Sequence, residues 1–148
     1  MSESCTLFCR LDVGNVDSLK SRLAIMVPDA IEQTNDNSGW FSIGCRLKSG
    51  TITFTRRIFV EQADPFTKLR GNTIIKIRSK KESDPQGAID TEKHMRSVNA
   101  IIGIVADPGF DQIDKLPELI AFLAMEYEAL IFNGSEFLDF SGNSVFLL

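Results

Sequence analysis

Residues 40–60 show the most regular alternation of hydrophobic and polar side chains in the chain. A period of two residues is typical of a strand that buries one face, and the stretch alternates both before and after a turn signal at Ser49-Gly50. We therefore predict a hairpin over residues 40–60. Arg56 interrupts the second alternation because it falls on the hydrophobic side. Two explanations stay open: a bulge near Arg56 and Arg57 that shifts the register, or an inward-pointing Arg56 that pairs with a buried acid.

Three other segments repeat hydrophobic residues at a spacing of three to four, which predicts amphipathic helices. The first ends before Pro28, the second opens near Asp90, and the third has Pro117 in its first turn. Short alternating or continuously hydrophobic stretches predict further strands. These strands cover residues 5–11, 30–34, 101–106, 129–132, 137–140 and 145–148.

Residues 64–86 fit two patterns. The spacing from Phe66 to Ile77 suits a helix, whereas the alternation that ends there suits a strand. Gly71-Asn72 favours a break between a short helix and a strand. The polar residues 79–87 predict a mobile loop.

Hairpins mixed with helices predict an α+β fold, with a mostly antiparallel sheet and about three helices packed on one face. The chain has 148 residues, a length that suits a single domain over residues 1–148. Its hydrophobic content of 43% and charged content of 24% are typical of globular proteins.

Basic residues are concentrated in the middle of the chain. Residues 46–81 hold ten of the sixteen Lys and Arg residues and only two acidic residues, a net charge of +8. Residues 1–45 carry −3 and residues 82–148 carry −9. The overall charge of −4 therefore hides a dipolar chain, and such a layout selects binding partners by their electrostatic potential.

Residues for enzymatic chemistry are sparse. His94 is the single histidine and is predicted to be structural, so a Ser-His-Asp or Cys-His arrangement has no other base. A zinc site needs three or four clustered His, Cys or carboxylate ligands, and one His and three scattered Cys do not supply them. The spacing of Asp107, Asp111 and Asp114 is not that of a calcium-binding loop. No glycine-rich phosphate loop is present. We predict no metal and no cofactor, while a small enzyme that uses a carboxylate pair stays an alternative because such pairs form in space.

Cysteine usage and hydropathy indicate a cytoplasmic protein. On one strand, Cys5 and Cys9 would lie about 13 Å apart, beyond the roughly 7 Å that a disulfide tolerates. We therefore expect these two residues and Cys45 to be buried free thiols. No hydrophobic run approaches the ~20 residues that span a bilayer, and the polar N-terminus does not resemble a signal peptide.

The basic segment supports two hypotheses. One is recognition of another protein by charge complementarity. The other is nucleic-acid binding, which the acidic pI of about 5.0 and the lack of aromatic stacking residues make the weaker hypothesis. Plain solvation with internal ion pairing stays open as an explanation without function.

Glu126 and Glu128 lie at the predicted C-terminal end of the third helix, where the helix dipole disfavours negative charge. We expect a basic neighbour such as Arg56 or Arg57, or a basic partner protein. With these two acids, the predicted partner-binding residues are Arg46, Arg56, Arg57, Lys68, Arg70, Lys76, Arg78, Glu126 and Glu128.

The two ends of the chain resemble a bacterial family. Residues 123–134, followed by Phe137-Leu138-Asp139 and Gly142, are similar to the end of the domain of unknown function 4272, and Cys5-Thr6-Leu7-Phe8 with the helix after it is similar to its opening. The family has no established activity, so the resemblance implies no catalytic residue. Small bacterial α+β proteins of this appearance are often immunity or accessory proteins near toxin systems. The resemblance therefore implies a non-enzymatic protein-binding module, and specifically an immunity protein that neutralises a toxin.

Overall fold

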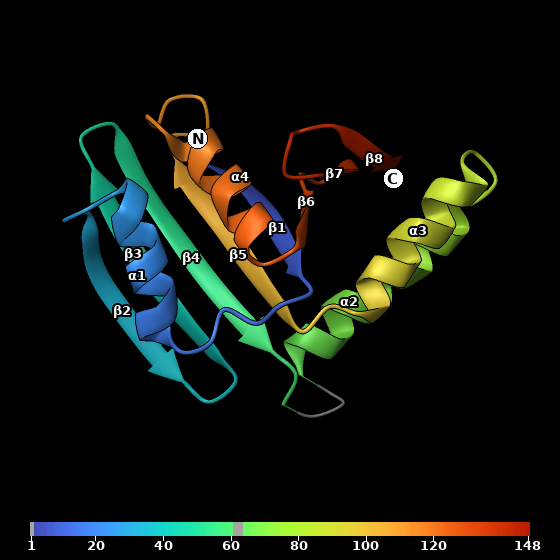
Figure 1. The fold of residues 1–148 in the computed structure, drawn as a ribbon, viewed down its shortest axis with the longest axis horizontal. Coiled ribbons are helices and arrows are strands. Elements are labelled where there is room, and N and C mark those ends of the chain that lie inside the picture. Colours follow the sequence, from blue (N-terminus) through green and yellow to red (C-terminus); the bar gives the residue numbers. More distant parts are fainter. Residues whose placement is uncertain (1, 61–63) are drawn as a thin grey trace.

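The computed structural model describes residues 2–60 and 64–148, which form an eight-stranded sheet (Figure 1). Each neighbouring pair of strands is antiparallel, in the order β2-β3-β4-β5-β1-β6-β7-β8. The first strand of the chain thus lies between two strands from the C-terminal part. The strands are β1 (Glu3–Cys9), β2 (Ile31–Asn37), β3 (Trp40–Leu47), β4 (Gly50–Ile58), β5 (Ala100–Asp107), β6 (Ala129–Phe132), β7 (Glu136–Leu138) and β8 (Ser144–Leu147).

Helices α1 (Val16–Met26) and α4 (Leu116–Glu126) lie on one face of the sheet and contact each other (Figure 1). Helix α1 begins where the Asn15 side chain accepts a hydrogen bond from the Ser18 backbone N–H at 2.9 Å, an N-cap that satisfies one of the unpaired N–H groups.

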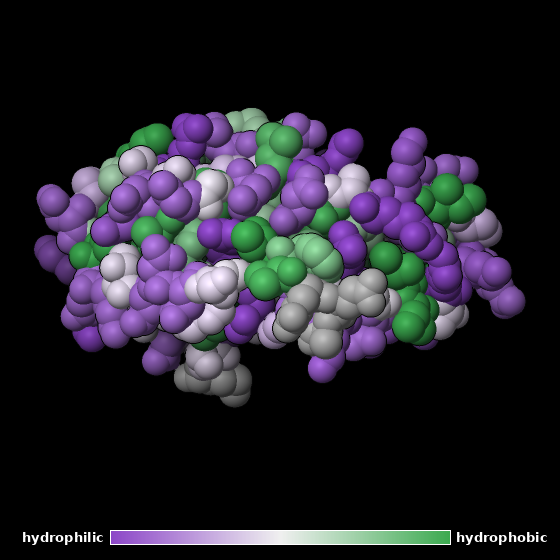
Figure 2. Space-filling view, turned by 90° about the horizontal axis from the view of Figure 1, so that it is seen from below, coloured by the Kyte–Doolittle hydropathy of each residue, from purple (hydrophilic) through white to green (hydrophobic). Residues whose placement is uncertain are grey.

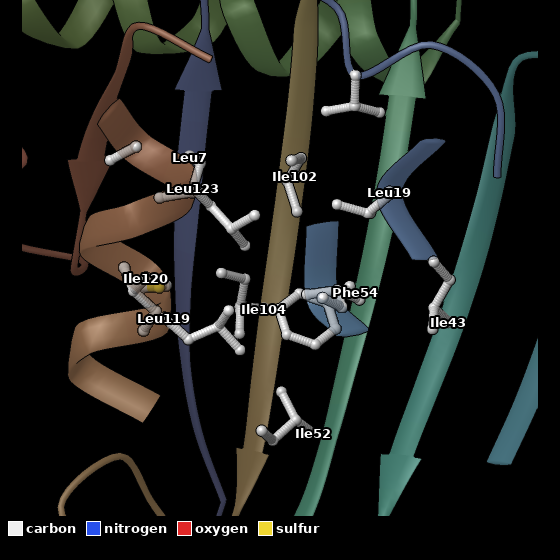
Figure 3. Packing of buried hydrophobic residues seen from close by; sticks show 14 of the residues in the cluster. Leu7, Leu19, Ile43, Ile52, Phe54, Ile102, Ile104, Leu119, Ile120 and Leu123 are labelled. Atoms are coloured by element: carbon white, nitrogen blue, oxygen red, sulfur yellow. The ribbon is translucent and has the colours of Figure 1, made fainter. Parts of the chain in front are cut away.

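The larger hydrophobic cluster fills the space between these two helices and the central strands. Figure 3 shows side chains from both helices pointing toward those of the strands. Fully burying such a side chain contributes about 1.5–3 kcal/mol, so this face is the main source of stability. The labelled side chains are Leu7, Leu19, Ile43, Ile52, Phe54, Ile102, Ile104, Leu119, Ile120 and Leu123.

Helices α2 and α3 form a hairpin at one end of the sheet and continue beyond it (Figure 1). They span Pro65–Ser79 and Pro85–Arg96. Phe66 and Met95 from this hairpin cluster with Phe8 of β1, whereas the flanking Leu7 and Cys9 belong to the larger cluster. Because successive strand residues point to opposite faces, the hairpin packs on the face opposite to α1 and α4.

The predicted α+β class with a mostly antiparallel sheet is confirmed. The described residues contain four helices where about three were predicted, and the extra one comes from the ambiguous segment. Residues 65–79 are helical throughout, across Gly71-Asn72. The loop predicted over residues 79–87 is shorter in the structure and covers residues 80–84. Helix α3 already begins at Pro85, where the Asp84 side chain accepts a hydrogen bond from the Gly87 N–H at 3.0 Å.

Arg56 points inward, and the register of β4 is continuous against both neighbours, so the bulge is absent. Its guanidinium lies over the Phe41 ring, 4.4 Å from the centroid, and one nitrogen is 3.7 Å from an Asp12 carboxylate oxygen. Asp12 is itself 41% exposed. The acid that pairs with Arg56 therefore lies at the edge of the core and not within it.

The second face is only partly covered by the described helices. Away from the hairpin it carries Gly44 and small polar residues of β3 and β4, such as Ser42, Thr53 and Thr55. Val105 of β5 is 46% exposed there. These residues alternate with the hydrophobic positions that the sequence pattern identified. The sheet thus has one hydrophobic face along β3 to β5 and one face that tolerates water.

Candidate functional site: a groove in the basic helical hairpin

The α2–α3 hairpin, defined as residues 64–97, concentrates the positive charge of the chain. It carries eight basic and five acidic residues, a net charge of +3, while the rest of the sequence carries −7. Residues 65–81 hold six basic residues and no acidic one. The basic segment seen in the sequence therefore lies largely on one protruding structure.

Helix α2 is held in place at its start and along one side. The Asp64 side chain accepts a hydrogen bond from the Thr67 N–H at 2.7 Å, and Pro65 suits the first helical position. Arg70 donates to the Val98 carbonyl at 3.2 Å, and its guanidinium lies 5.1 Å from the Phe66 ring centroid. Arg70 therefore serves to fasten the helix to the segment that leads into β5.

A groove of about 310 Å³ runs between α2 and α3. Its hydrophobic lining comes from Ile77, Ala88 and Ile89, and Ile89 is 62% exposed. Figure 2 shows hydrophobic side chains set among hydrophilic ones at the end of the molecule that the hairpin forms, on the right. The charged residues that line the groove are Arg78, Lys81, Glu92, Lys93 and Arg96.

Glu92 organises two of the four cations. The Arg78 Nε–H donates to one Glu92 carboxylate oxygen at 2.6 Å and its Nη2–H donates to the other at 3.1 Å, while the Arg96 Nε–H donates at 3.0 Å. The hydrogen bonds from Arg78, reinforced by those from Arg96, lower the pKa of Glu92 to about 2. The carboxylate is thus ionised over the whole neutral range and holds both guanidinium groups across the groove. Lys81 and Lys93 form no ion pair within the described parts of the chain.

The structure brings Lys68, Arg70, Lys76 and Arg78 together on α2, and of these Arg78 alone lines the groove. The three predicted site residues from the β3–β4 hairpin lie elsewhere, as do the two acids.

Arg56 and Arg57 project from opposite faces of β4, because they are consecutive residues of one strand. Arg57 lies 5.9 Å from the Trp40 ring centroid on the second face. Arg46 is bound through its Nε–H to both carboxylate oxygens of Glu32 at 3.1 Å. These three residues therefore do not form a surface with α2.

Glu126 and Glu128 do have basic neighbours, but not the expected ones. Glu126 lies 3.6 Å from Arg22 of α1, and Glu128 lies 3.7 Å from Arg10 after β1. The expectation of Arg56 or Arg57 is wrong because α1, and not the β3–β4 hairpin, is the element that α4 packs beside.

The groove residues Ile89, Glu92, Lys93 and Arg96 of α3 were not among the predicted site residues. The signal was present: Glu92 and Arg96 are four residues apart, and an Asp-Pro pair at residues 84–85 marks a helix start. The predicted helix opened near Asp90, so Ala88 and Ile89 of the groove wall lay outside it.

His94 and the three cysteines lie in buried surroundings that suit a structural role. The His94 Nε2 lies 2.8 Å from the Phe8 carbonyl oxygen, and burial lowers the pKa of the imidazole. Burial also raises the pKa of Cys5 to about 12 and that of Cys45 to about 11, and it raises the pKa of Cys9. The three cysteines are free and buried, as predicted, and thiols of such high pKa are poor nucleophiles at neutral pH.

Among residues 2–60 and 64–148, no group of three His, Cys, Asp or Glu side chains is placed to hold a metal ion. The groove itself offers four cationic side chains and the Glu92 carboxylate around a hydrophobic lining.

Comparisons with protein-family models, with curated proteins and with solved structures find no match for this chain. The resemblance of its two ends to the domain of unknown function 4272 stays a prediction. The helices of the described residues include none long and hydrophobic enough to cross a lipid bilayer.

Proposed function

We propose that the chain is a protein-binding module whose α2–α3 groove takes an acidic segment of a partner protein. One observation carries the proposal: the groove combines four cations with a hydrophobic lining in which Ile89 is exposed. Opposite charges steer a partner toward the surface and set its orientation. The exposed Ile89 side chain supplies hydrophobic area that a partner removes from water.

The Glu92 bridge supports binding by preorganisation. Arg78 and Arg96 are already held in position by Glu92, so a partner carboxylate orders fewer side chains when it binds. Immobilising a long side chain costs about 0.5–1.5 kcal/mol. Each guanidinium keeps further N–H donors for a second carboxylate.

Nucleic acid is the second candidate, because the same cations suit phosphate groups. The groove favours protein over nucleic acid because its hydrophobic lining consists of Ile and Ala side chains. No aromatic ring lines the groove among the described residues. Single-stranded nucleic acids bind largely by stacking on aromatic side chains. Phe66, the nearest aromatic residue on α2, is buried beneath Arg70.

A specific form of this proposal is a bacterial immunity protein that neutralises a toxin in the cytoplasm. The resemblance at both chain ends and the three free thiols support it, since thiols stay reduced in the cytosol. A gene for a toxin-like protein next to the gene of this chain, with a product that co-purifies in equal amounts, is the expected finding. An unrelated neighbouring gene would contradict the immunity role and leave the binding module intact.

Fluorescence anisotropy with a short labelled peptide of Leu and Glu tests the groove directly. The double substitution Lys81→Glu and Lys93→Glu is expected to weaken binding by at least about tenfold, because it reverses two of the four cations. Lys48→Glu is the matched control, since Lys48 belongs to the same basic segment of the sequence but lies in the exposed turn between β3 and β4. Equal affinities for all three proteins would contradict the proposal.

The same variants separate the two candidates. If duplex DNA binds in low salt with a steep salt dependence, and the double substitution abolishes that binding while the peptide fails to bind, the nucleic-acid function is correct.

A further inference from the structure

A second groove lies between α4 and the β6–β7 strands and has a hydrophobic lining with acidic surroundings. Its volume is about 390 Å³. Side chains from α4, from β6 and β7, from the segment after β5 and from the turn before β8 meet there. The hydrophobic residues that line it are chiefly Phe110, Pro117, Ile120, Ile131, Leu138 and Phe140.

The walls of this groove are held in fixed positions. In the turn that carries Phe140, the Asp139 side chain accepts hydrogen bonds from the Ser141 N–H at 2.9 Å and from the Asn143 N–H at 3.0 Å. On the other wall, the Phe110 N–H donates to the Glu3 side chain at 3.1 Å. The groove thus exists before any ligand binds, and a preformed site costs less ordering on binding.

Phe140 is 51% exposed at the groove. A small molecule in the groove would leave the outer side of the Phe140 ring in water. A protein segment can cover both the groove and the outer side of this ring. A hydrophobic groove with an exposed aromatic residue at its edge is typical of a protein interaction site.

The charges around the groove define the partner. Asp111 lines it, and no Lys or Arg does so within the described residues. Four more carboxylates belong to residues that form a hydrogen bond with a lining residue or adjoin a lining residue in the sequence. None of the five forms an ion pair in the part of the chain that the structure describes. The five acids are Glu3, Asp111, Glu118, Glu136 and Asp139, of which Glu136 donates its backbone N–H to the side chain of the lining residue Asn133.

We infer that this groove docks a basic amphipathic segment of a partner protein, with its hydrophobic side chains in the groove and its Lys or Arg residues beside the carboxylates. The charge requirement is the reverse of that at the α2–α3 groove. The two sites lie on different elements, so the inference stands without the proposed function.

A labelled peptide of Leu and Lys, measured by fluorescence anisotropy in low salt, tests the inference. Phe140→Ser and Asp111→Lys are each expected to weaken its binding at least about tenfold. Their matched controls are Ile25→Ser, which removes an exposed hydrophobic residue from α1, and Asp36→Lys, which reverses an exposed charge on β2 at the opposite edge of the sheet. Asp111 is exposed, so its substitution keeps the test valid if Phe140→Ser disturbs the turn.

Specificity decides the outcome. A Leu and Glu peptide that binds as tightly at the same groove, or Leu and Lys binding that the two substitutions leave unchanged, would overturn the inference. Sedimentation velocity of the protein alone tests whether a second copy of this chain occupies the groove. Self-association that Asp111→Lys abolishes would show that a second copy, and not a different partner, fills the groove.

Discussion

The two faces of the sheet differ in how they are covered. On the first face, α1 and α4 enclose a continuous core along β1 and β3 to β6. On the second face, the α2–α3 hairpin covers only the end that includes Phe8, Phe137 and Phe146, and small polar residues fill the part along β3 and β4. The first face therefore supplies most of the hydrophobic stabilisation, while the second face carries a protruding element with the basic groove.

This difference places the main hydrophobic core and the basic groove in separate parts of the molecule. A hairpin attached through a small cluster can open locally at a lower free energy than the whole protein requires. The three cysteines all lie in the larger cluster. Their reaction with a thiol reagent thus reports opening of the first face and is silent about the hairpin.

The largest expected effect is on the first face. Phe54→Ala removes a fully buried ring from beneath α1 and α4, and such substitutions cost about 3–5 kcal/mol. Urea unfolding is expected to show this loss, together with faster labelling of the three thiols. A loss under about 1 kcal/mol would contradict the conclusion that the first face supplies most of the hydrophobic stabilisation.

Phe66→Ala is the corresponding change on the second face. Phe66 is also fully buried, but it belongs to the cluster that attaches the hairpin. Amide hydrogen exchange is expected to accelerate in α2 and α3, while thiol labelling keeps the wild-type rate. If labelling accelerates as much as in Phe54→Ala, the two faces unfold as one unit and the separation is wrong.

A smaller effect is expected from Glu92→Gln within the hairpin. The pKa of Glu92 is lowered to about 2 by Arg78 and Arg96, against about 4.3 in an unfolded chain. Its stabilising contribution is therefore complete above about pH 4.3 and is lost as the pH falls through about 2. For exposed ion pairs the contribution is under about 1 kcal/mol.

Urea midpoints of wild type and Glu92→Gln are expected to differ near neutral pH and to converge as the pH is lowered toward 2. Glu82→Gln, an exposed acid of the same hairpin, should give a curve parallel to that of the wild type. Convergence in the control as well would show that general charge repulsion, and not the Glu92 bridge, governs the acid response.

Local sequence signals predicted much of the fold because they depend on neighbours in the chain. The alternation over 40–60 became β3 and β4, and the helices before Pro28 and after Pro117 are present. The start of α3 was missed although its capping Asp84 and Pro85 are local signals. The ambiguity over residues 65–79 is different, because this segment shows both periodicities. It becomes a helix here because the helix packs Phe66 and Ile77 into the smaller hydrophobic cluster.

The candidate site depended on contacts between distant residues. Sequence alone determined that positive charge is concentrated over residues 46–81, because charge is a property of each residue wherever it lies. Only the tertiary structure decided that Arg56 and Arg57 point to opposite faces, that Arg10 and Arg22 meet Glu128 and Glu126, and that α3 completes the groove. The physical reason is that ion pairs and grooves join residues far apart in the chain, and their partners are chosen by how whole elements pack.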